Sequence, residues 1–149
     1  MPLDPIAGST FADVFSNELP SPNYIYDLPT SDQYGIVDDS MSISTASGYW
    51  IALLEDATIT LEAENQISTE SILLNSGWNL IGCPQPFDID TSSLMIVYNT
   101  DTMSFYNAVS GGLLSSSALY TWDSQTGSYS SNNGLKTWNG QWVASNTDT

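Results

Sequence analysis

The sequence predicts an all-β protein built of small sandwich or barrel modules in tandem, with one short helix near residues 9–19. Two observations support this fold class. Runs of β-branched and aromatic residues recur at intervals of roughly ten residues, which is typical of sandwiches and barrels. Helical periodicity is scarce between these runs, so an α/β fold, which needs helices between its strands, is not favoured.

The expected helix has the sequence STFADVFSNEL. Ser9 or Thr10 can cap its first turn through the side-chain oxygen. A second, shorter helical turn is expected at 104–112, where the sequence ends in two glycines. In the first helix the apolar side chains recur at the i, i+3 and i+4 spacing of one stripe: Phe11, Val14, Phe15 and Leu19.

The remaining elements are predicted to be short strands. The clusters LPTSDQ, TDTMS, SQTGS and SSNNG are expected to form turns between them, because turns favour Gly, Pro, Asn, Asp and Ser. The predicted strands lie at 23–28, 48–54, 57–63, 71–76, 77–83, 94–99, 118–123 and 141–145.

Parts of the first half recur in the second half. The stretch GYWIA at 48–52 aligns with GQWVA at 140–144, an offset of 140 − 48 = 92 residues. The stretch NYIYD at 23–27 aligns in the same order with LYTWD at 119–123. A shared order of several elements indicates an internal repeat.

The repeat suggests two modules of unequal completeness. We expect a first β module at 1–66, which lacks an opening strand of the GWNLIG type, and a nearly complete second module at 67–149. The closing stretch of the second copy stops at NTDT, where the first copy continues into ITLEA. We therefore expect a sheet that is incomplete within one chain.

Charge excludes two classes of partner. The chain has 17 carboxylates against the single cation Lys136, a formal net charge of −16. Nucleic acid and anionic membrane surfaces both require clustered Lys and Arg, so neither is an expected partner. No segment has the length and apolarity of a membrane span. The Lys and Arg poverty and the Ser, Thr, Asn and Gln content favour an extracellular or cell-surface protein.

The motif GWNLIGCP, followed by a strand of the Y-x-W-D type and a closing G-x-W-V, resembles the GWNLIG/GYW repeat modules of bacterial and archaeal cell-surface (S-layer or sheath-like) proteins. The resemblance implies an exported protein, often in tandem arrays, and implies no catalytic residues. The chain departs from the pattern at Gln141, where the family has an aromatic. The matching residues are Leu74, Gly77 to Gly82, Pro84, Ala108, Gly111, Leu113, Leu119, Tyr120, Trp122, Asp123, Leu135, Trp138, Gly140, Trp142 and Val143.

Catalysis is not expected. The chain has no His, so the commonest general base and the Ser-His-Asp arrangement are absent. Its one Cys and one Lys have no imidazole to activate them. We expect a non-enzymatic protein that requires no cofactor.

Calcium is the metal that the acidic composition favours, because hard cations bind carboxylate and carbonyl oxygens. The stretch FDIDTSS supplies Asp88 and Asp90, and VDDS supplies Asp38 and Asp39. Neither stretch matches the twelve-residue EF-hand loop. An ordinary solvated acidic loop is the alternative for both.

The aromatic side chains and the single cysteine each allow two interpretations. Tyr and Trp residues can stack against a glycan, but recurrence of Trp with the repeat favours a role in the core. Because neighbouring side chains alternate across a strand, Tyr49 and Trp50 cannot share one platform. Cys83 is either a buried small hydrophobe or the site of an intermolecular disulfide.

The function predicted from the sequence is that of an extracellular structural protein, a subunit of a surface layer, sheath or filament. An incomplete sheet exposes an edge that a neighbouring copy can pair with, which gives a homo-oligomer or polymer. The candidate donor strands contain Leu3 and Ile6 at one end and Trp142 and Val143 at the other. The alternative is a non-catalytic carbohydrate-binding or adhesion module.

Overall fold

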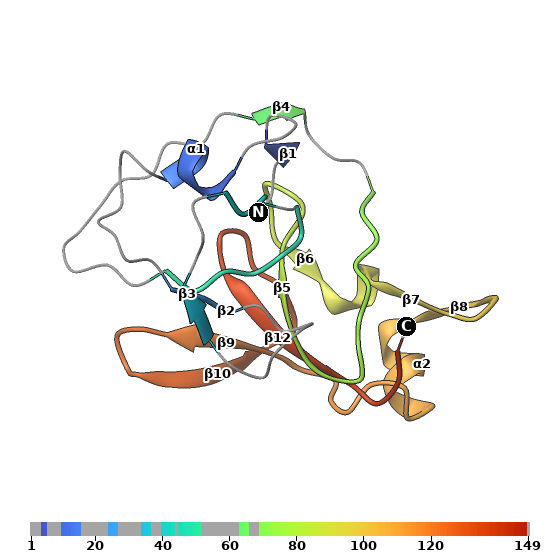
Figure 1. Ribbon diagram of the computed structural model, residues 1–149. Coiled ribbons are helices and arrows are strands. Elements are labelled where there is room, and N and C mark those ends of the chain that lie inside the picture. The colour runs from blue at the N-terminus through green and yellow to red at the C-terminus, as the bar shows by residue number, and fades with distance from the viewer. Residues whose placement is uncertain are drawn as a thin grey trace.

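The computed structural model describes residues 4–5, 10–15, 24–26, 34–36, 40–43, 45–51, 63–65 and 69–148. Within these residues the protein consists mostly of strands in antiparallel sheets, together with two small α-helices and one 3-10 turn (Figure 1). The all-β fold class and the short helix expected near 9–19 are confirmed. Leu3 and Ile6, and Asp38 and Asp39, lie outside the described residues.

The elements of the first half are few and short. They are β1 (Asp4–Pro5), α1 (Phe11–Phe15), β2 (Tyr24–Tyr26), β3 (Tyr34–Ile36) and β4 (Ala63–Asn65). The second half contains β5 (Gly77–Gly82), β6 (Ile89–Asp90), η1 (Thr91–Ser93), β7 (Met95–Tyr98), β8 (Asp101–Ser104), α2 (Phe105–Ser110), β9 (Leu119–Asp123), β10 (Ser128–Asn132), β11 (Gly134–Leu135) and β12 (Gly140–Ser145).

One four-stranded sheet organises the second half, with strand order β10-β9-β12-β5. All its pairs are antiparallel, and β12 pairs with β5 along its whole length, from Gly140 opposite Gly82 to Ser145 opposite Gly77. The other strands form two-stranded pairs: β1 with β4, β2 with β3, β6 with β11, and β7 with β8. The strand β12 is therefore an interior strand, and β5 lies at the edge of this sheet.

Side-chain caps set the starts of both α-helices. Thr10 Oγ1 accepts a hydrogen bond from the Asp13 N–H, and Asp13 Oδ2 accepts one from the Thr10 N–H, so Thr10 is the cap that the sequence suggested. Ser104 Oγ accepts from the Asn107 N–H at the start of α2. This second helix ends at Gly111, and Gly112 then adopts a positive φ of 78°.

The core lies between the inner face of the four-stranded sheet and α2 with its neighbouring strands. Ala108 and Leu119 are fully buried in it. Its apolar members come from β5, α2, β9, β11, β12 and the connections between them: Leu74, Ile81, Cys83, Phe105, Ala108, Leu114, Leu119, Leu135 and Val143. This core positions the edge of β5 described below.

Four local predictions are wrong, and the first is the strand expected at 48–54, whose described residues 48–51 belong to no strand. TDTMS was expected to be a turn, but it forms β8, because the hairpin turn is only Asn99 and Thr100, with Asn99 at φ 55°. SSNNG was also expected to be a turn, but it supplies most of β10, an exposed edge strand where Ser and Asn are tolerated. The strand expected at 71–76 has no ladder partner among the described residues.

Candidate assembly site at the edge of β5

The strand GWNLIG has two different faces. Asn79 and Ile81 point into the core and are buried, whereas Trp78 and Leu80 point to the outer face of the sheet. Trp78 is 52% exposed. Asn79 holds the entry to the strand, because its Oδ1 accepts from the Asn75 N–H at 2.9 Å and its Nδ2 donates to the Asn75 carbonyl at 2.8 Å.

A segment from the first half occupies the outer edge of β5. We call residues 45–51, with the sequence TASGYWI, the GYW segment. The Gly82 N–H donates to the Ala46 carbonyl at 2.6 Å, and the Gly48 N–H donates to the Leu80 carbonyl at 3.4 Å. Between these two bonds, Ser47 and Ile81 form an antiparallel bridge. The strand β5 is thus bonded by β12 on one edge and by the GYW segment on the other.

Where the GYW segment packs against the edge of β5, Ala46 has an unusual backbone conformation. Ala46 is buried and has a φ of 61°, the left-handed region that non-glycine residues rarely adopt. The chain turns at 45–46, and this turn precedes the bond from Gly82 to the Ala46 carbonyl. The conformation of Ala46 is therefore part of the docked arrangement.

Two glycines that occupy equivalent positions in the sequence repeat lie against the same leucine. A Cβ at Gly48 would come 2.7 Å from Leu80 Cγ and 3.2 Å from the Ile81 carbonyl oxygen, so a side chain does not fit there. A Cβ at Gly140 would come 3.1 Å from Leu80 Cδ1 and 3.8 Å from the Gly48 Cα. The glycines of both G-x-W stretches, Gly48 and Gly140, therefore pack against Leu80.

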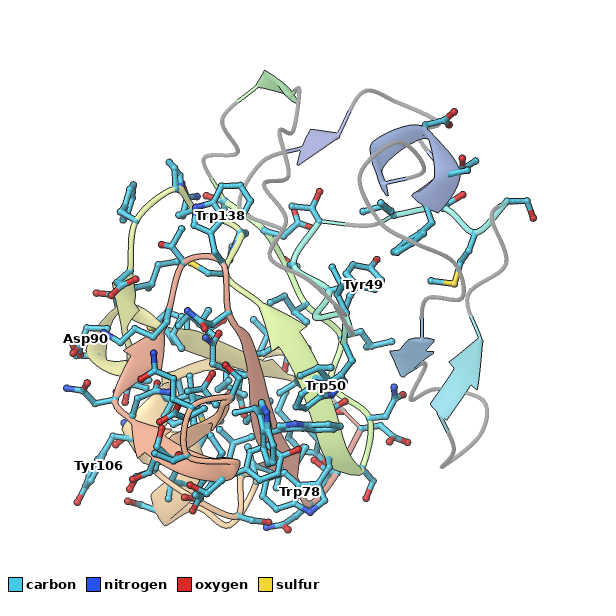
Figure 2. All side chains as sticks on the ribbon, turned by 90° about the vertical axis from the view of Figure 1, so that its left-hand side faces the viewer. Tyr49, Trp50, Trp78, Asp90, Tyr106 and Trp138 are labelled. Carbon is cyan, nitrogen blue, oxygen red and sulfur yellow. The ribbon has the colours of Figure 1, made fainter. Side chains whose placement is uncertain are left out.

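Aromatic rings gather on the outer face of the same sheet (Figure 2). The Trp50 ring of the GYW segment lies 5.7 Å from the Trp122 ring, and Trp122 lies 5.1 Å from Tyr129, both in edge-to-face geometry. Trp78 and Tyr120 form a third such pair at 5.9 Å. Edge-to-face pairs add stability beyond area burial. The indole nitrogen of Trp50 is buried and has no hydrogen-bond partner.

The predicted donor residues Trp142 and Val143 lie in the interior strand β12. Val143 is 2% exposed and belongs to the core, and both residues pair with β5 in their own chain. Donating this strand to a neighbouring copy requires it to leave the centre of the sheet.

A second feature, an apolar groove, lies on the other side of the core. This groove of about 570 Å³ runs between residues 70–74 and β7, and core side chains including Ile81, Leu119 and Val143 line it. Exposed apolar side chains stand on both flanks, with Leu73 74% and Val97 57% exposed. Within the described part of the chain, no strand pairs with residues 71–74 or with the outer edge of β7.

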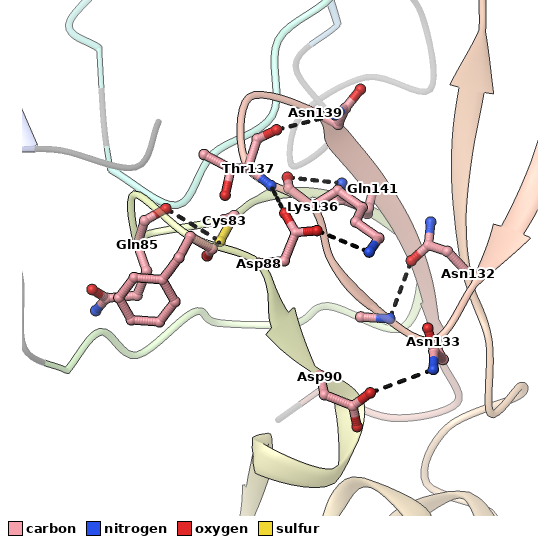
Figure 3. A network of polar contacts seen from close by, with 12 residues as sticks. Cys83, Gln85, Asp88, Asp90, Asn132, Asn133, Lys136, Thr137, Asn139 and Gln141 are labelled. Atoms are coloured by element: carbon pink, nitrogen blue, oxygen red, sulfur yellow. Dashed lines mark hydrogen bonds and ion pairs between the residues drawn. The ribbon is translucent and has the colours of Figure 1, made fainter.

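The two acidic residues of FDIDTSS bind groups of the protein itself (Figure 3). Asp88 Oδ2 lies 2.9 Å from Lys136 Nζ, and Asp88 Oδ1 accepts from the Thr137 N–H at 2.9 Å. The hydrogen bond from Lys136 and that from the Thr137 backbone hold the pKa of Asp88 below its ordinary value of 3.8. Asp88 thereby ties the 84–88 connection to the turn before β12.

Asp90 has a capping role. Its Oδ1 accepts from the Ser92 N–H at 2.8 Å at the start of η1, and its Oδ2 accepts from Asn133 Nδ2 at 3.4 Å. Hydrogen bonds from Ser92 lower its pKa. Among the residues that the structure describes, no group of three or more His, Cys, Asp or Glu side chains gathers where it could hold a metal ion.

Cys83 is buried, with 2% of its surface exposed. Its thiol lies 3.4 Å from the Phe87 carbonyl and 3.5 Å from the Gln85 carbonyl, to which it donates. An intermolecular disulfide at Cys83 therefore requires this part of the core to open.

The two G-x-W stretches and the GWNLIG strand are recognisable in the sequence, but the site that they share is not. The sequence predicts that the GYW stretch is a closing strand whose opening partner is missing. The signal that points to sharing is the glycine common to both stretches, since a conserved spacing between copies suggests a shared partner. That partner is Leu80 of β5.

No protein-family model, no curated protein and no solved structure matches the chain. No helix in the described part of the chain is long and apolar enough to cross a membrane.

Proposed function

We propose that this chain is an extracellular, non-catalytic structural protein, a subunit of a surface layer, sheath or filament that assembles by sharing strands between copies. The observation that carries the proposal is the double pairing of β5, which bonds β12 on one edge and the GYW segment on the other. A strand that accepts a segment from elsewhere in the chain is suited to accept the same segment from a neighbour.

The apolar groove beside β7 supports the same function. Its flanks have unpaired backbone among the described residues, and its floor is the core of the protein. A solvated apolar groove with free backbone groups is the surface that an added strand covers, because main-chain hydrogen bonds and side-chain burial both contribute.

Sizing chromatography with light scattering, followed by negative-stain microscopy, tests this function. The expected result is high-order species that become filaments, tubes or sheets as concentration and ionic strength rise. A chain that stays monomeric at every concentration and salt level contradicts the proposal. The resemblance to GWNLIG/GYW surface proteins adds to the expectation of an exported array but is not needed for the experiment.

Glycan binding is the second candidate, and the outer aromatic face favours it. Trp78 is 52%, Tyr129 48% and Trp122 38% exposed, so their rings are open to a ligand. With a net charge of −16, the protein favours a neutral polysaccharide over an acidic one. Affinity electrophoresis in gels containing hydroxyethyl-cellulose tests this function. Retardation that is lost in Tyr129→Ala but kept in Tyr106→Ala, an exposed tyrosine on α2, is the expected result for a glycan site.

A further inference from the structure

We propose that the strand exchanged between copies is the GYW segment: residues 46–48 of one copy bond to the edge of β5 in the next. The inference rests on the proposed function and names its donor and its acceptor. It replaces the two ends of the chain, where the sequence placed the donor, with an internal segment.

The two candidate donor strands differ in the contacts that each loses on leaving its own chain. Removing β12 breaks its ladders with β5 and β9 and exposes Val143, which is 2% exposed in the folded chain. Removing the GYW segment breaks the backbone hydrogen bonds at Ala46 and Gly48 and separates the Trp50 ring from Trp122, but it leaves the ladders of the four-stranded sheet intact. The GYW segment is therefore the segment that can move between copies while both copies stay folded.

The outer edge of β5 fits the GYW segment as its acceptor. The carbonyl of Leu80 and the N–H of Gly82 both point to the outer edge of β5, where they bond Gly48 and Ala46. Leu80 accepts only a residue without a side chain at the facing position, since a Cβ at Gly48 would lie 2.7 Å from its Cγ. This requirement makes the edge selective for a segment with glycine at this position, which sets the register in which a neighbouring copy pairs.

A second copy of this chain is the partner that fits the edge of β5. The same contact is made inside the chain, so a second copy supplies an identical donor in the same geometry, which is the basis of strand exchange between protomers. Residues 52–68 connect the donor to the described residues that precede β5. Donor and acceptor therefore belong to different parts of each chain. Exchange that is not reciprocal leads from one copy to the next, and it gives a filament where the rotation between copies does not close a ring.

Two single-cysteine chains test the exchange directly. The bonds at 46 with 82 and at 48 with 80 make Ser47 and Ile81 a non-hydrogen-bonded pair, in which Cα atoms are about 4.5 Å apart, within reach of a disulfide. One chain carries Ser47→Cys and the other Ile81→Cys. Both carry Cys83→Ser, whose hydroxyl can replace the thiol as donor to the Gln85 and Phe87 carbonyls.

The two chains are mixed at low ionic strength, assembled by raising the salt, and oxidised. Neither chain can form the disulfide alone, so the mixed disulfide reports pairing between copies only. The expected result is a covalent heterodimer that accumulates in the assembled fraction. The control replaces Ile81→Cys by Ser130→Cys on β10, the opposite edge of the same sheet, and should give at least tenfold less heterodimer.

A second set of variants tests the fit at Leu80. Gly48→Val in the donor chain should abolish the heterodimer and the assembly. Gly111→Ala at the end of α2, where a Cβ would meet the Asn107 carbonyl oxygen at 3.2 Å and no atom of β5, is the matched glycine control and should retain both. Gly48→Ala should weaken assembly, and adding Leu80→Ala should restore it, because that change removes the Cγ that the new Cβ meets.

The outcomes separate the two proposals. Assembly without the mixed disulfide, or assembly that survives Gly48→Val, overturns the GYW segment as donor and leaves the proposed function standing. A wild-type chain that never assembles overturns both. A heterodimer that also forms with Ser130→Cys at the same yield shows random oxidation and likewise overturns the assigned donor.

Discussion

Lys136 Nζ lies 2.9 Å from Asp88 Oδ2, and Lys136 is the one cation among the side chains of a protein with 17 carboxylates. The pair joins the 84–88 connection after β5 to the turn before β12. Both side chains are substantially solvated, at 41% and 52% exposure, so the pair positions these two turns more than it stabilises the fold.

Replacing Lys136 by Met should make stability less sensitive to acid. The pKa of Asp88 is lowered, first by the Lys136 hydrogen bond, so its contribution is complete above the ordinary pKa of 3.8 and is lost as pH falls through the lower folded value. The stability difference between wild type and Lys136→Met should therefore be present at neutral pH and disappear once the pH lies below the lowered pKa of Asp88. Urea unfolding at several pH values measures it. The charge-preserving Lys136→Arg should follow the wild type, and a difference that persists in acid contradicts the assignment.

Gln141 should tolerate loss of its amide but not a gain of charge. The side chain is fully buried, its Nε2 donates to the Lys136 carbonyl at 3.1 Å, and its Oε1 has no partner. Gln141→Leu removes one hydrogen bond and one unsatisfied oxygen, so the free energy of unfolding should change by no more than about 1 kcal/mol. Gln141→Glu buries an unpaired carboxylate and should cost about 3 kcal/mol or more at neutral pH. Equal urea midpoints for the two variants would disprove this description of the site.

Trp138 should be replaceable with a gain in stability. It has a φ of 63° and is 63% exposed, so its backbone is strained while its ring contributes little burial. Trp138→Asn should raise the free energy of unfolding by roughly 0.5–1 kcal/mol, because Asn adopts this conformation more readily. Trp138→Val, with a β-branched side chain, should instead lower it. Thermal unfolding of the two variants, compared with wild type, gives the sign of each effect.

Ionic strength should promote assembly. Copies that each carry a net charge of −16 repel one another, and the Debye length falls from about 30 Å at 0.01 M salt to about 8 Å at 0.15 M. The assembled fraction measured by light scattering should therefore rise over this range. Calcium compared with sodium at equal ionic strength separates screening from binding: an extra effect that Asp88→Asn and Asp90→Asn reduce would assign calcium to these carboxylates.

The Cys83 thiol should be unreactive in the folded protein. It is 2% exposed, so a thiol reagent reaches it only when the chain opens locally or globally. Labelling with Ellman's reagent should be at least about tenfold slower in buffer than in denaturing urea. Rapid labelling of the folded chain would return Cys83 to the candidates for an intermolecular disulfide.

Alternation of β-branched and aromatic residues was enough to predict the long strands. It located β5, β7, β9 and β12 to within one or two residues, because their side chains face a core on one side. It failed for β8 and β10, whose Ser, Thr and Asp residues are exposed and whose strand state depends on pairing with a neighbour. Local composition cannot report a partner that lies elsewhere in the chain.

The candidate site, like the strands, could be predicted from the sequence only in part. The G-x-W repeat was visible in the sequence, yet the position of Gly48 against Leu80 follows from the approach of two backbones and has no local signature. The acidic pairs were visible too, but the hydrogen bonds that occupy Asp88 and Asp90 come from residues more than 40 positions away or from a cap geometry. The residue types indicated what each side chain can bind, but they did not indicate which residues lie next to it in the fold.

The double pairing of β5 also couples the stabilities of the two halves. Neighbouring repeats stabilise one another through their interface, so we expect the second half to melt at a lower temperature when the GYW segment is removed. In an array of such repeats, the bonds at Ala46 and Gly48 would set how far unfolding spreads from one repeat to the next. In the polymer that we propose, order would be lost and regained in runs of neighbouring copies, and the length of a run would depend on how well Gly48 packs on Leu80.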